Sequence, residues 1–379
     1  MSEFPVKRIS DSEKISWIRL CRTQNISKNI FFNLLKIFGN VDEALANVEE
    51  FSLKGGLKKP IKIADEKSAI LELNNCQKIG AQIICFIEPE YPKLLREIPD
   101  PPPIITIRGN SDLLSCDIMS IVGPRNASTN GCKFAGKIAT ELGKAGLIIA
   151  SGMARGIDRA AHLGSLESGT IAVIAGGIDN IYPPENKDLY NQIIQKGVVI
   201  SENPFGSMPK GGNFPRRNRI ISGVSLGVVI VEATLKSGTL ITARFALEQN
   251  RDIFAVPGSP FDPRSQGTNR LIKQGAKLVE DVNDILDEID NLRSRNFGTI
   301  EFREKEFFEF SGFDIKIISD SEIDEARKLI LQKINYSSIS LDELIYQLQI
   351  PAQIANIVLV QLELAGRVEY KNGKVALVL

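Results

Sequence analysis

The stretch Ile118–Asp158 reads IMSIVGPRNASTNGCKFAGKIATELGKAGLIIASGMARGID and decides the fold class of the chain. A continuous apolar run, IMSIV, ends in a Gly-Pro turn; an amphipathic segment follows, and a second apolar run, LIIAS, ends in another glycine. Runs that are apolar at every position indicate strands buried on both faces of a sheet, and parallel strands need a helical crossover between them. The stretch therefore predicts a βαβ unit of a parallel sheet.

The same alternation continues to residue 289. Five more apolar runs follow, each separated from the next by a segment with helical spacing: TIAVI, GVVIS, LGVVIV, DIFAV and AKLV. We therefore predict an α/β fold with an extended Rossmann-like, doubly wound and mostly parallel sheet. In such a sheet ligands bind outside the carboxyl ends of the strands.

The chain has 379 residues, enough for about three domains. Residues 1–80 predict a small N-terminal helical module of the SAM or helix-hairpin-helix type, with Ser27 and Asp42 at N-cap positions and glycines where the helices stop. Residues 81–292 form the predicted Rossmann-like domain. Within it, the four prolines at positions 99–103 indicate an extended connector that cannot be helical.

The C-terminal part of the chain contains a linker and a third domain. Residues 293–320 are charged and hold six phenylalanines, which is typical of a flexible linker and, less often, of a partner-docking motif. Residues 321–379 give three helical segments and two alternating segments joined at Asn372-Gly373, a hairpin signal. This order predicts a winged helix.

Composition excludes several classes of function. The single histidine, His162, has no identifiable serine or cysteine partner, so we interpret it as a hydrogen-bonded packing residue and predict no catalytic residue. The five cysteines include no C-x-x-C pair, which indicates reduced thiols and a cytoplasmic location, with no metal site and no cofactor. No apolar run approaches the length of a membrane span, so we expect no membrane contact.

Charge is balanced overall but segregated locally. The 46 Lys+Arg residues equal the 46 Asp+Glu residues, so the whole chain has no global attraction for a polyanion. Residues 203–277, however, hold 11 Lys+Arg against four Asp+Glu, whereas residues 280–290 hold six acids and no base. Any nucleic-acid contact is therefore expected in the Rossmann-like domain. The winged helix, with six bases and seven acids, is more typical of a partner-binding or regulatory module.

The turn after the first strand of that domain, GPRNASTNG, offers an anion site at the start of a helix. Arg125 supplies a cation there, and Ser128 lies beside backbone N–H groups that a phosphate can reach. Equally, Asn126, Ser128 and Asn130 can simply cap the helix. The turn is not G-x-G-x-x-G, so no dinucleotide fingerprint is present.

The loop after the fourth strand, SMPKGGNFPRRNR, carries the strongest signal for nucleic acid. It has four bases and no acid beside Phe214. Cations for phosphates together with an aromatic ring for a base are what single-stranded nucleic acid requires. A solvated basic loop with Phe214 buried is the alternative. The candidate DNA-binding residues of this loop are Lys210, Phe214, Arg217, Asn218 and Arg219, with Arg216 solvated.

A second candidate anion cradle follows the fifth strand. Ser237, Gly238 and Thr239 precede a helix, so their N–H groups can receive phosphate oxygens. Glu232, at the end of the same strand, is the one plausible general base for an enzyme. Tyr182, in the loop after the third strand, is expected only to shape that loop.

Nine motifs from about Tyr91 to Ala276 occur in consistent order: GPRNASTNG, SGMARGID, AHLG, GGID..YPPEN, SENPFG, FPRRNRIISG, EATLKSGTLITA, RDIFAVPG and GTNRLIKQGA. This set resembles the bacterial DNA-processing protein A family, DprA, also called Smf. The resemblance implies a cytoplasmic, dimeric protein that binds single-stranded DNA. It implies protection of incoming DNA during natural transformation and the loading of RecA recombinase on strands covered by single-strand-binding protein.

The resemblance also implies roles for particular residues. Arg125 matches the DNA-contacting turn arginine of the family, Lys210 through Arg219 match its basic loop, and Ser237–Thr239 match its phosphate-cradling turn. The competing interpretation is a nucleotide-processing enzyme similar to phosphoribohydrolases, in which Glu232 would act. Lys236-Ser237 replaces the double glycine of those enzymes, which disfavours that interpretation.

Overall fold

The computed structural model describes residues 4–294, 319–371 and 373–378. Of these, residues 4–8 and 72–294 form one compact unit, which we name the crevice unit. Residues 9–71 form the second unit together with residues 319–371 and 373–378, and we name it the terminal unit. The six phenylalanines of the predicted linker lie outside the described residues.

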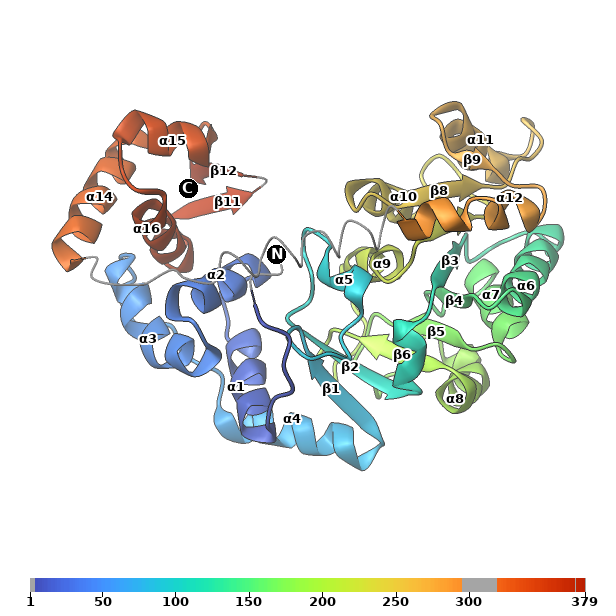
Figure 1. The fold of residues 1–379 in the computed structure, drawn as a ribbon, viewed down its shortest axis with the longest axis horizontal. Helices are drawn as coiled ribbons and strands as arrows, with labels where there is room; N and C mark the ends of the chain where they lie inside the picture. The colour runs from blue at the N-terminus through green and yellow to red at the C-terminus, as the bar shows by residue number, and fades with distance from the viewer. Residues whose placement is uncertain (1–3, 295–318, 372, 379) are drawn as a thin grey trace. The chain divides into compact units, whose positions relative to one another are not determined.

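The crevice unit is built on a nine-stranded sheet with the order β1-β2-β6-β5-β4-β3-β7-β8-β9 (Figure 1). The pairs from β6 through β9 are parallel, and β1 and β2 add an antiparallel extension at one edge. The strands are β1 (Ala81–Cys85), β2 (Ile104–Gly109), β3 (Ile118–Val122), β4 (Ile148–Ser151), β5 (Thr170–Val173), β6 (Val198–Ser201), β7 (Gly227–Ile230), β8 (Asp252–Ala255) and β9 (Lys277–Leu278).

The Rossmann-like prediction is confirmed, and all seven predicted parallel strands are present, as β3 to β9. The sheet is wound outward from β3, which pairs with β4 on one side and with β7 on the other. This reversal of strand order opens a crevice at the carboxyl ends of β3, β4 and β7. The proline-rich segment at residues 99–103 is not helical, as the sequence predicts, and the chain enters strand β2 directly after it.

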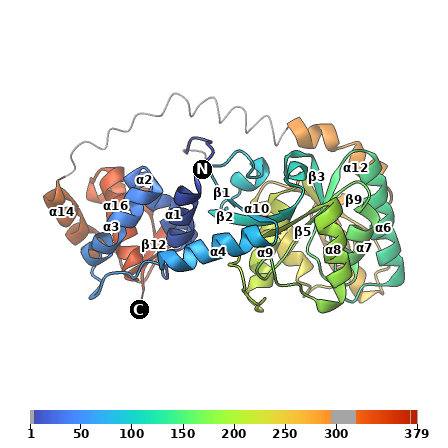
Figure 2. The same cartoon turned by 90° about the horizontal axis from the view of Figure 1, so that it is seen from below.

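Helices cover both faces of the sheet. Figure 2 shows α6, α7 and α8 side by side on one face. Side chains alternate along β3: Met119 and Ile121 join the apolar cluster with α6, while the Ser120 hydroxyl donates to the Ile221 carbonyl of α9 at 2.8 Å. Helix α9 therefore lies on the other face, where it packs against α10. The helices of the unit are α5 (Lys93–Arg96), α6 (Thr129–Lys144), α7 (Ile157–Ser165), α8 (Lys187–Lys196), α9 (Asn213–Gly223), α10 (Thr239–Glu248), α11 (Gln266–Lys273) and α12 (Asn283–Leu286).

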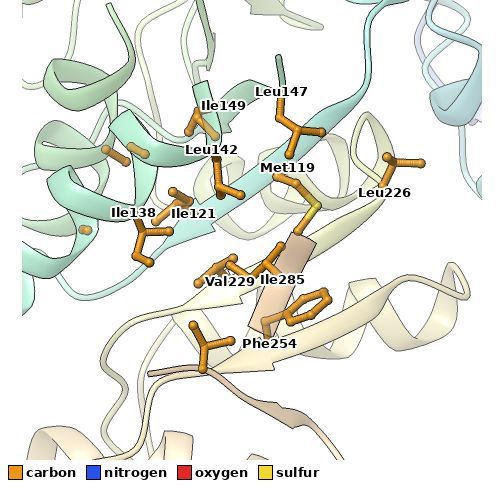
Figure 3. Packing of buried hydrophobic residues seen from close by; sticks show 14 of the residues in the cluster. Met119, Ile121, Ile138, Leu142, Leu147, Ile149, Leu226, Val229, Phe254 and Ile285 are labelled. Carbon is orange, nitrogen blue, oxygen red and sulfur yellow. The ribbon is translucent and has the colours of Figure 1, made fainter. Parts of the chain in front are cut away.

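The apolar core of the crevice unit lies between the sheet and α6. Figure 3 shows side chains of β3, β7 and β8 meeting Ile138 and Leu142 of α6 and Ile285 of α12. These residues occur at alternate positions on the strands and at helical spacing on α6, which is why the apolar pattern of the sequence predicts both. The rigid core fixes where the strand-end loops begin.

The terminal unit combines the two ends of the chain. Its N-terminal helices are α1 (Asp11–Arg22), α2 (Lys28–Phe38) and α3 (Val41–Lys54), and α4 (Glu66–Lys78) continues the chain into the crevice unit. Its C-terminal elements are α14 (Asp320–Lys333), β10 (Ile339–Ser340), α15 (Leu341–Leu348), α16 (Ala352–Leu364), β11 (Val368–Lys371) and β12 (Lys374–Leu377). Three helices closed by a three-stranded sheet make the predicted winged helix.

The helix caps of the terminal unit follow the sequence with one exception. The Ser27 hydroxyl accepts from the Ile30 N–H at 3.2 Å, and Gly39 ends α2 with φ of 80°. The predicted cap at Asp42 is wrong, because the Asn40 side chain caps α3 by accepting from the Glu43 N–H at 2.9 Å. Asp42 lies in the first turn, where its charge still favours the helix.

Candidate nucleic-acid interface

A pocket of about 150 Å³ opens at the carboxyl edge of the sheet. Its walls come from the loops after β3, β4 and β5 and from the start of α9, so segments far apart in the sequence converge there. Glycine allows this convergence. A Cβ at Gly152 would lie 1.8 Å from Nη1 of Arg217, so no other residue leaves room for that guanidinium.

The aromatic side of the pocket holds a cation on a ring. The Arg125 guanidinium lies over the Phe214 ring at 4.9 Å from its centroid, and the Tyr182 and Phe214 rings lie 5.5 Å apart at 57°. Arg125 and Tyr182 are exposed and Phe214 is half-buried. The structure therefore brings two predicted DNA-binding residues, Arg125 and Phe214, into direct contact.

Tyr182 is the residue that the sequence interpretation underestimated. It lines the pocket and packs on Phe214, whereas the sequence suggested only a loop-shaping role. Arg155 was also missed; it lines the same pocket and pairs with Glu185 at 3.8 Å. Both residues follow the carboxyl ends of central strands, and that position is the signal that could have found them.

Arg217 forms the floor of the pocket. It is buried, and its Nη1 donates to the Val173 carbonyl at 2.8 Å. Burial lowers the pKa of Arg217 to about 10, against the opposing charge of Asp158, so the side chain remains a cation at neutral pH. Its Nε has no partner within the part of the chain that the structure describes. Arg217 is thus a fixed, partly unsatisfied cation beneath the aromatic wall.

His162 lies below the same loops and is a packing residue, as the sequence suggested. Its Nδ1 lies 2.8 Å from the Thr170 hydroxyl, which itself donates to the Ile149 carbonyl. The Thr170 oxygen must then accept from the Nδ1–H of a neutral imidazole. Burial lowers the pKa of His162 to about 3, so the ring stays neutral at physiological pH.

Lys210 and Arg216 are exposed, and neither lines the pocket. The loop that carries Lys210 is fixed to the loop after β5, since the Gly177 N–H donates to the Ser207 carbonyl at 2.7 Å and the Gly206 N–H donates to Asp179 at 2.8 Å. Lys210 therefore projects from an ordered turn beside the pocket.

Arg219 corrects the sequence interpretation. Its side chain is 4% exposed; its Nε pairs with Asp100 at 3.0 Å, and its Nη2 pairs with Glu202. A guanidinium held by two carboxylates inside the fold is not available to a phosphate. Arg219 instead joins α9 to the proline-rich segment and the end of β6.

The contacts of Ser128 and Glu232 also differ from the roles that the sequence predicts for them. The Ser128 side chain caps α6 by accepting from the Gly131 N–H at 2.8 Å. The Glu232 carboxylate accepts from the Ser128 N–H at 3.0 Å and from the Ser128 hydroxyl at 2.5 Å. The chain's own carboxylate thus takes the anion position at this helix start. Ser128 is a cap rather than a phosphate ligand, and Glu232 is engaged in the fold.

The turn before α10 forms a separate cluster. The Ser237 and Thr239 hydroxyls lie 2.9 Å apart, and the Thr239 N–H donates to the Ser237 hydroxyl at 3.1 Å. The Asn218 amide donates to the Gly238 carbonyl at 3.4 Å, so α9 brings Asn218 to this turn. Gly238 is exposed. Four predicted residues therefore lie together, although part of their hydrogen-bonding capacity is used within the turn.

Comparison with known proteins agrees with this architecture. The family model described as DNA recombination-mediator protein A matches residues 82–290. A DprA-like N-terminal HHH domain model matches residues 11–74, and a DprA winged helix domain model matches residues 319–374. The chain belongs to the DprA family.

Relatives of this DprA-family chain match most of its length. It is 37% identical to protein Smf of Synechocystis over 291 residues, which is 73% of either chain. It is 43% identical to DNA processing protein DprA of Bacillus subtilis over 213 residues, 55% of this chain and 72% of that one.

Two solved DprA structures share the fold. The Streptococcus pneumoniae structure superposes with a TM-score of 0.62 at 35% identity, over 74% of this chain and 99% of that chain. The Helicobacter pylori structure, described for its single-stranded DNA binding mode, gives 0.52 at 30% identity, over 56% and 96%. The predicted N-terminal helix-hairpin-helix type and the C-terminal winged helix are confirmed by the family models.

Proposed function

We propose that this DprA-family protein binds single-stranded DNA in the pocket at the carboxyl edge of its sheet, without catalysing a reaction. The family assignment and the single-stranded DNA binding of the Helicobacter pylori relative support the proposal. The observation that carries it is the contact of Arg125, Phe214 and Tyr182 above the buried cation Arg217.

Each residue has a physical role in this proposal. Arg125 and Lys210 neutralise phosphates, and the charge of Arg217 attracts them to the pocket. Phe214 and Tyr182 offer ring surface to unpaired bases. Asn218 and Ser237–Thr239 provide a second polar contact for the strand. Ser128 and Arg219 are left out, because the structure commits both to the fold.

A salt titration tests the proposal. With two to four phosphate contacts, the log of the binding constant for single-stranded DNA should fall against log salt with a slope of roughly −1.4 to −2.8. Duplex DNA of the same length should bind more weakly at every salt concentration, because paired bases cannot stack on the rings. Equal affinity for both forms would contradict the proposed pocket.

We further propose that the protein acts in the cytoplasm as a homodimer that protects DNA and helps RecA to load on strands covered by single-strand-binding protein. The description of the matched family as a recombination mediator supports this role. No helix among the described residues is long and apolar enough to span a bilayer. Sedimentation velocity tests the dimer. A shorter lag in RecA ATP hydrolysis on covered strands tests the loading.

The enzyme alternative depends on Glu232, and the structure disfavours it. Both carboxylate oxygens accept hydrogen bonds from Ser128. These two bonds hold the carboxylate against the start of α6 and use part of its accepting capacity, which disfavours it as a general base for a substrate. Release of free base from nucleoside monophosphates would nevertheless establish the alternative, and it is measured directly by chromatography.

A further inference from the structure

Helix α16 is apolar on two opposite faces, and the winged-helix domain explains only one of them. Its sequence, AQIANIVLVQLEL, has nine buried residues. Five of these belong to the core of the winged helix: Ile354, Ala355, Val358, Leu359 and Leu362. At 100° per residue these five positions occupy one side of the helix.

The other four buried residues lie on the opposite side. Ile357, Val360, Gln361 and Leu364 are spaced by three and four residues, and none belongs to the winged-helix core. Outside its own domain, α16 packs against α2 and α3 of the N-terminal helical domain. Those two helices therefore cover the second face.

The contact is close at the end of α3. A Cβ at Gly55 would lie 1.9 Å from the Gln361 carbonyl oxygen and 3.1 Å from Cβ of Ala365. Nearby, the Lys54 ammonium pairs with Asp320 at 2.9 Å, and this hydrogen bond raises the pKa of Lys54. Gly55 has ordinary right-handed helical angles, φ −71° and ψ −13°. The backbone alone would accept any residue there, so the glycine is required by the contact.

In a helix-turn-helix the second helix is the one that enters the DNA major groove. Here α15 and α16 form that pair, so α16 holds the position of the recognition helix. It contains no lysine or arginine, and its one charged residue is Glu363. A helix without cations gains nothing from the phosphate backbone, and a face covered by α2 and α3 cannot lie in a groove.

We propose that the winged helix is a docking module whose partner is the N-terminal helical domain of the same chain, and that α16 does not read DNA. The two terminal domains then work as one body joined through α16. This proposal is independent of the DNA-binding pocket, which lies in the crevice unit.

Hydrogen exchange of the full chain tests the docking with Gly55→Ala. Alanine fits the backbone angles of Gly55 but not the space beside Gln361. Exchange in peptides covering residues 28–54 and 352–364 should rise together, by about tenfold, while crevice-unit peptides stay unchanged. Glu49→Ala, at an exposed position of the same helix, is the matched control and should leave exchange as in the wild type. Unchanged exchange in a folded Gly55→Ala protein would overturn the docking.

A charge swap provides a second test with little risk to folding, because Lys54 and Asp320 are partly or largely exposed. Lys54→Glu or Asp320→Lys should each raise exchange at the contact about twofold, and the double variant should restore protection. Protection that falls on dilution would show that the cover comes from a second copy, against the proposal. Slower exchange in α16 on addition of duplex DNA would show that α16 reads DNA.

Discussion

At the residue scale, Phe214 tests the proposed pocket and Phe261 is its matched control. Phe214 lies under the guanidinium of Arg125, whereas Phe261 is 95% exposed and does not line the pocket. Phe214→Ala should weaken single-stranded DNA binding by about 5- to 160-fold, the usual value of one base stacked on an aromatic ring. Phe261→Ala should leave the affinity unchanged. Fluorescence anisotropy with a labelled oligonucleotide measures both, and equal effects would contradict the stacking role.

Arg216 and Arg219 separate a solvated cation from a structural one. Arg219→Ala should destabilise the crevice unit by about 3–5 kcal/mol, because it removes a buried guanidinium that pairs with two carboxylates, Asp100 and Glu202. We expect a fall in Tm of about 10 °C. Arg216→Ala removes an exposed side chain and should change Tm by less than about 2 °C. Thermal unfolding followed by circular dichroism distinguishes the two, and similar Tm values would refute the structural role of Arg219.

The sequence does not distinguish the arginine that lines the pocket, Arg217, from the one that does not, Arg219. Arg217 and Arg219 are two residues apart in a basic run, and their carboxylate and carbonyl partners come from Asp100, Glu202 and Val173. Nothing local in the run reveals these partners, so a solvated or DNA-facing arginine and a buried one look alike. The sequence allows Ser128 to be either a helix cap or a phosphate ligand. The carboxylate that occupies the anion position beside it belongs to Glu232, which lies 104 residues further along the chain.

At the element scale, α16 and β11 bring the carboxylates of Glu363 and Glu369 close enough to repel each other. Burial, and then the charge of Glu369, raise the pKa of Glu363 to about 7. A carboxyl with a raised folded pKa destabilises the fold as pH rises from its unfolded pKa toward the folded value. Glu363→Gln should therefore stabilise the terminal unit above pH 7, by roughly 1–2 kcal/mol after allowance for partial exposure, and have no effect below pH 4.5.

Urea unfolding at pH 5 and pH 8, followed by the fluorescence of Trp17, measures this difference. Glu343→Gln, at an exposed position of α15, is the control and should give the same stability change at both pH values. A gain from Glu363→Gln that does not depend on pH would show that the carboxyl is not the cause.

The sequence predicts most elements because each has a local pattern. The seven parallel strands lie in short, mostly apolar runs, and the winged-helix elements carry helical spacing and a hairpin. Strands β1 and β2 were not predicted because their pairing is antiparallel and nonlocal and because prolines directly precede β2. The second apolar face of α16 is visible in its sequence. The helices that cover it precede α16 by about 300 residues along the chain, so no local pattern reveals them.

At the scale of the whole molecule, the chain divides into two compact units. The single tryptophan, Trp17, is buried in the terminal unit, whereas the proposed DNA pocket lies in the crevice unit. Tryptophan fluorescence should therefore report a thermal transition that saturating single-stranded DNA does not shift. Calorimetry should show a second transition that rises with oligonucleotide concentration, by mass action. A fluorescence midpoint that moves with DNA would show that the units unfold as one.

The pairing of Lys54 with Asp320 spans 266 residues of chain. At roughly 5–20 residues per second, the ribosome needs about 15–50 s to make the intervening sequence. The N-terminal helices therefore leave the ribosome well before α16 exists. During that interval the surface of α2 and α3 that α16 will cover is exposed to water or to another protein. The ribosome also completes the crevice unit before the two ends of the chain can join.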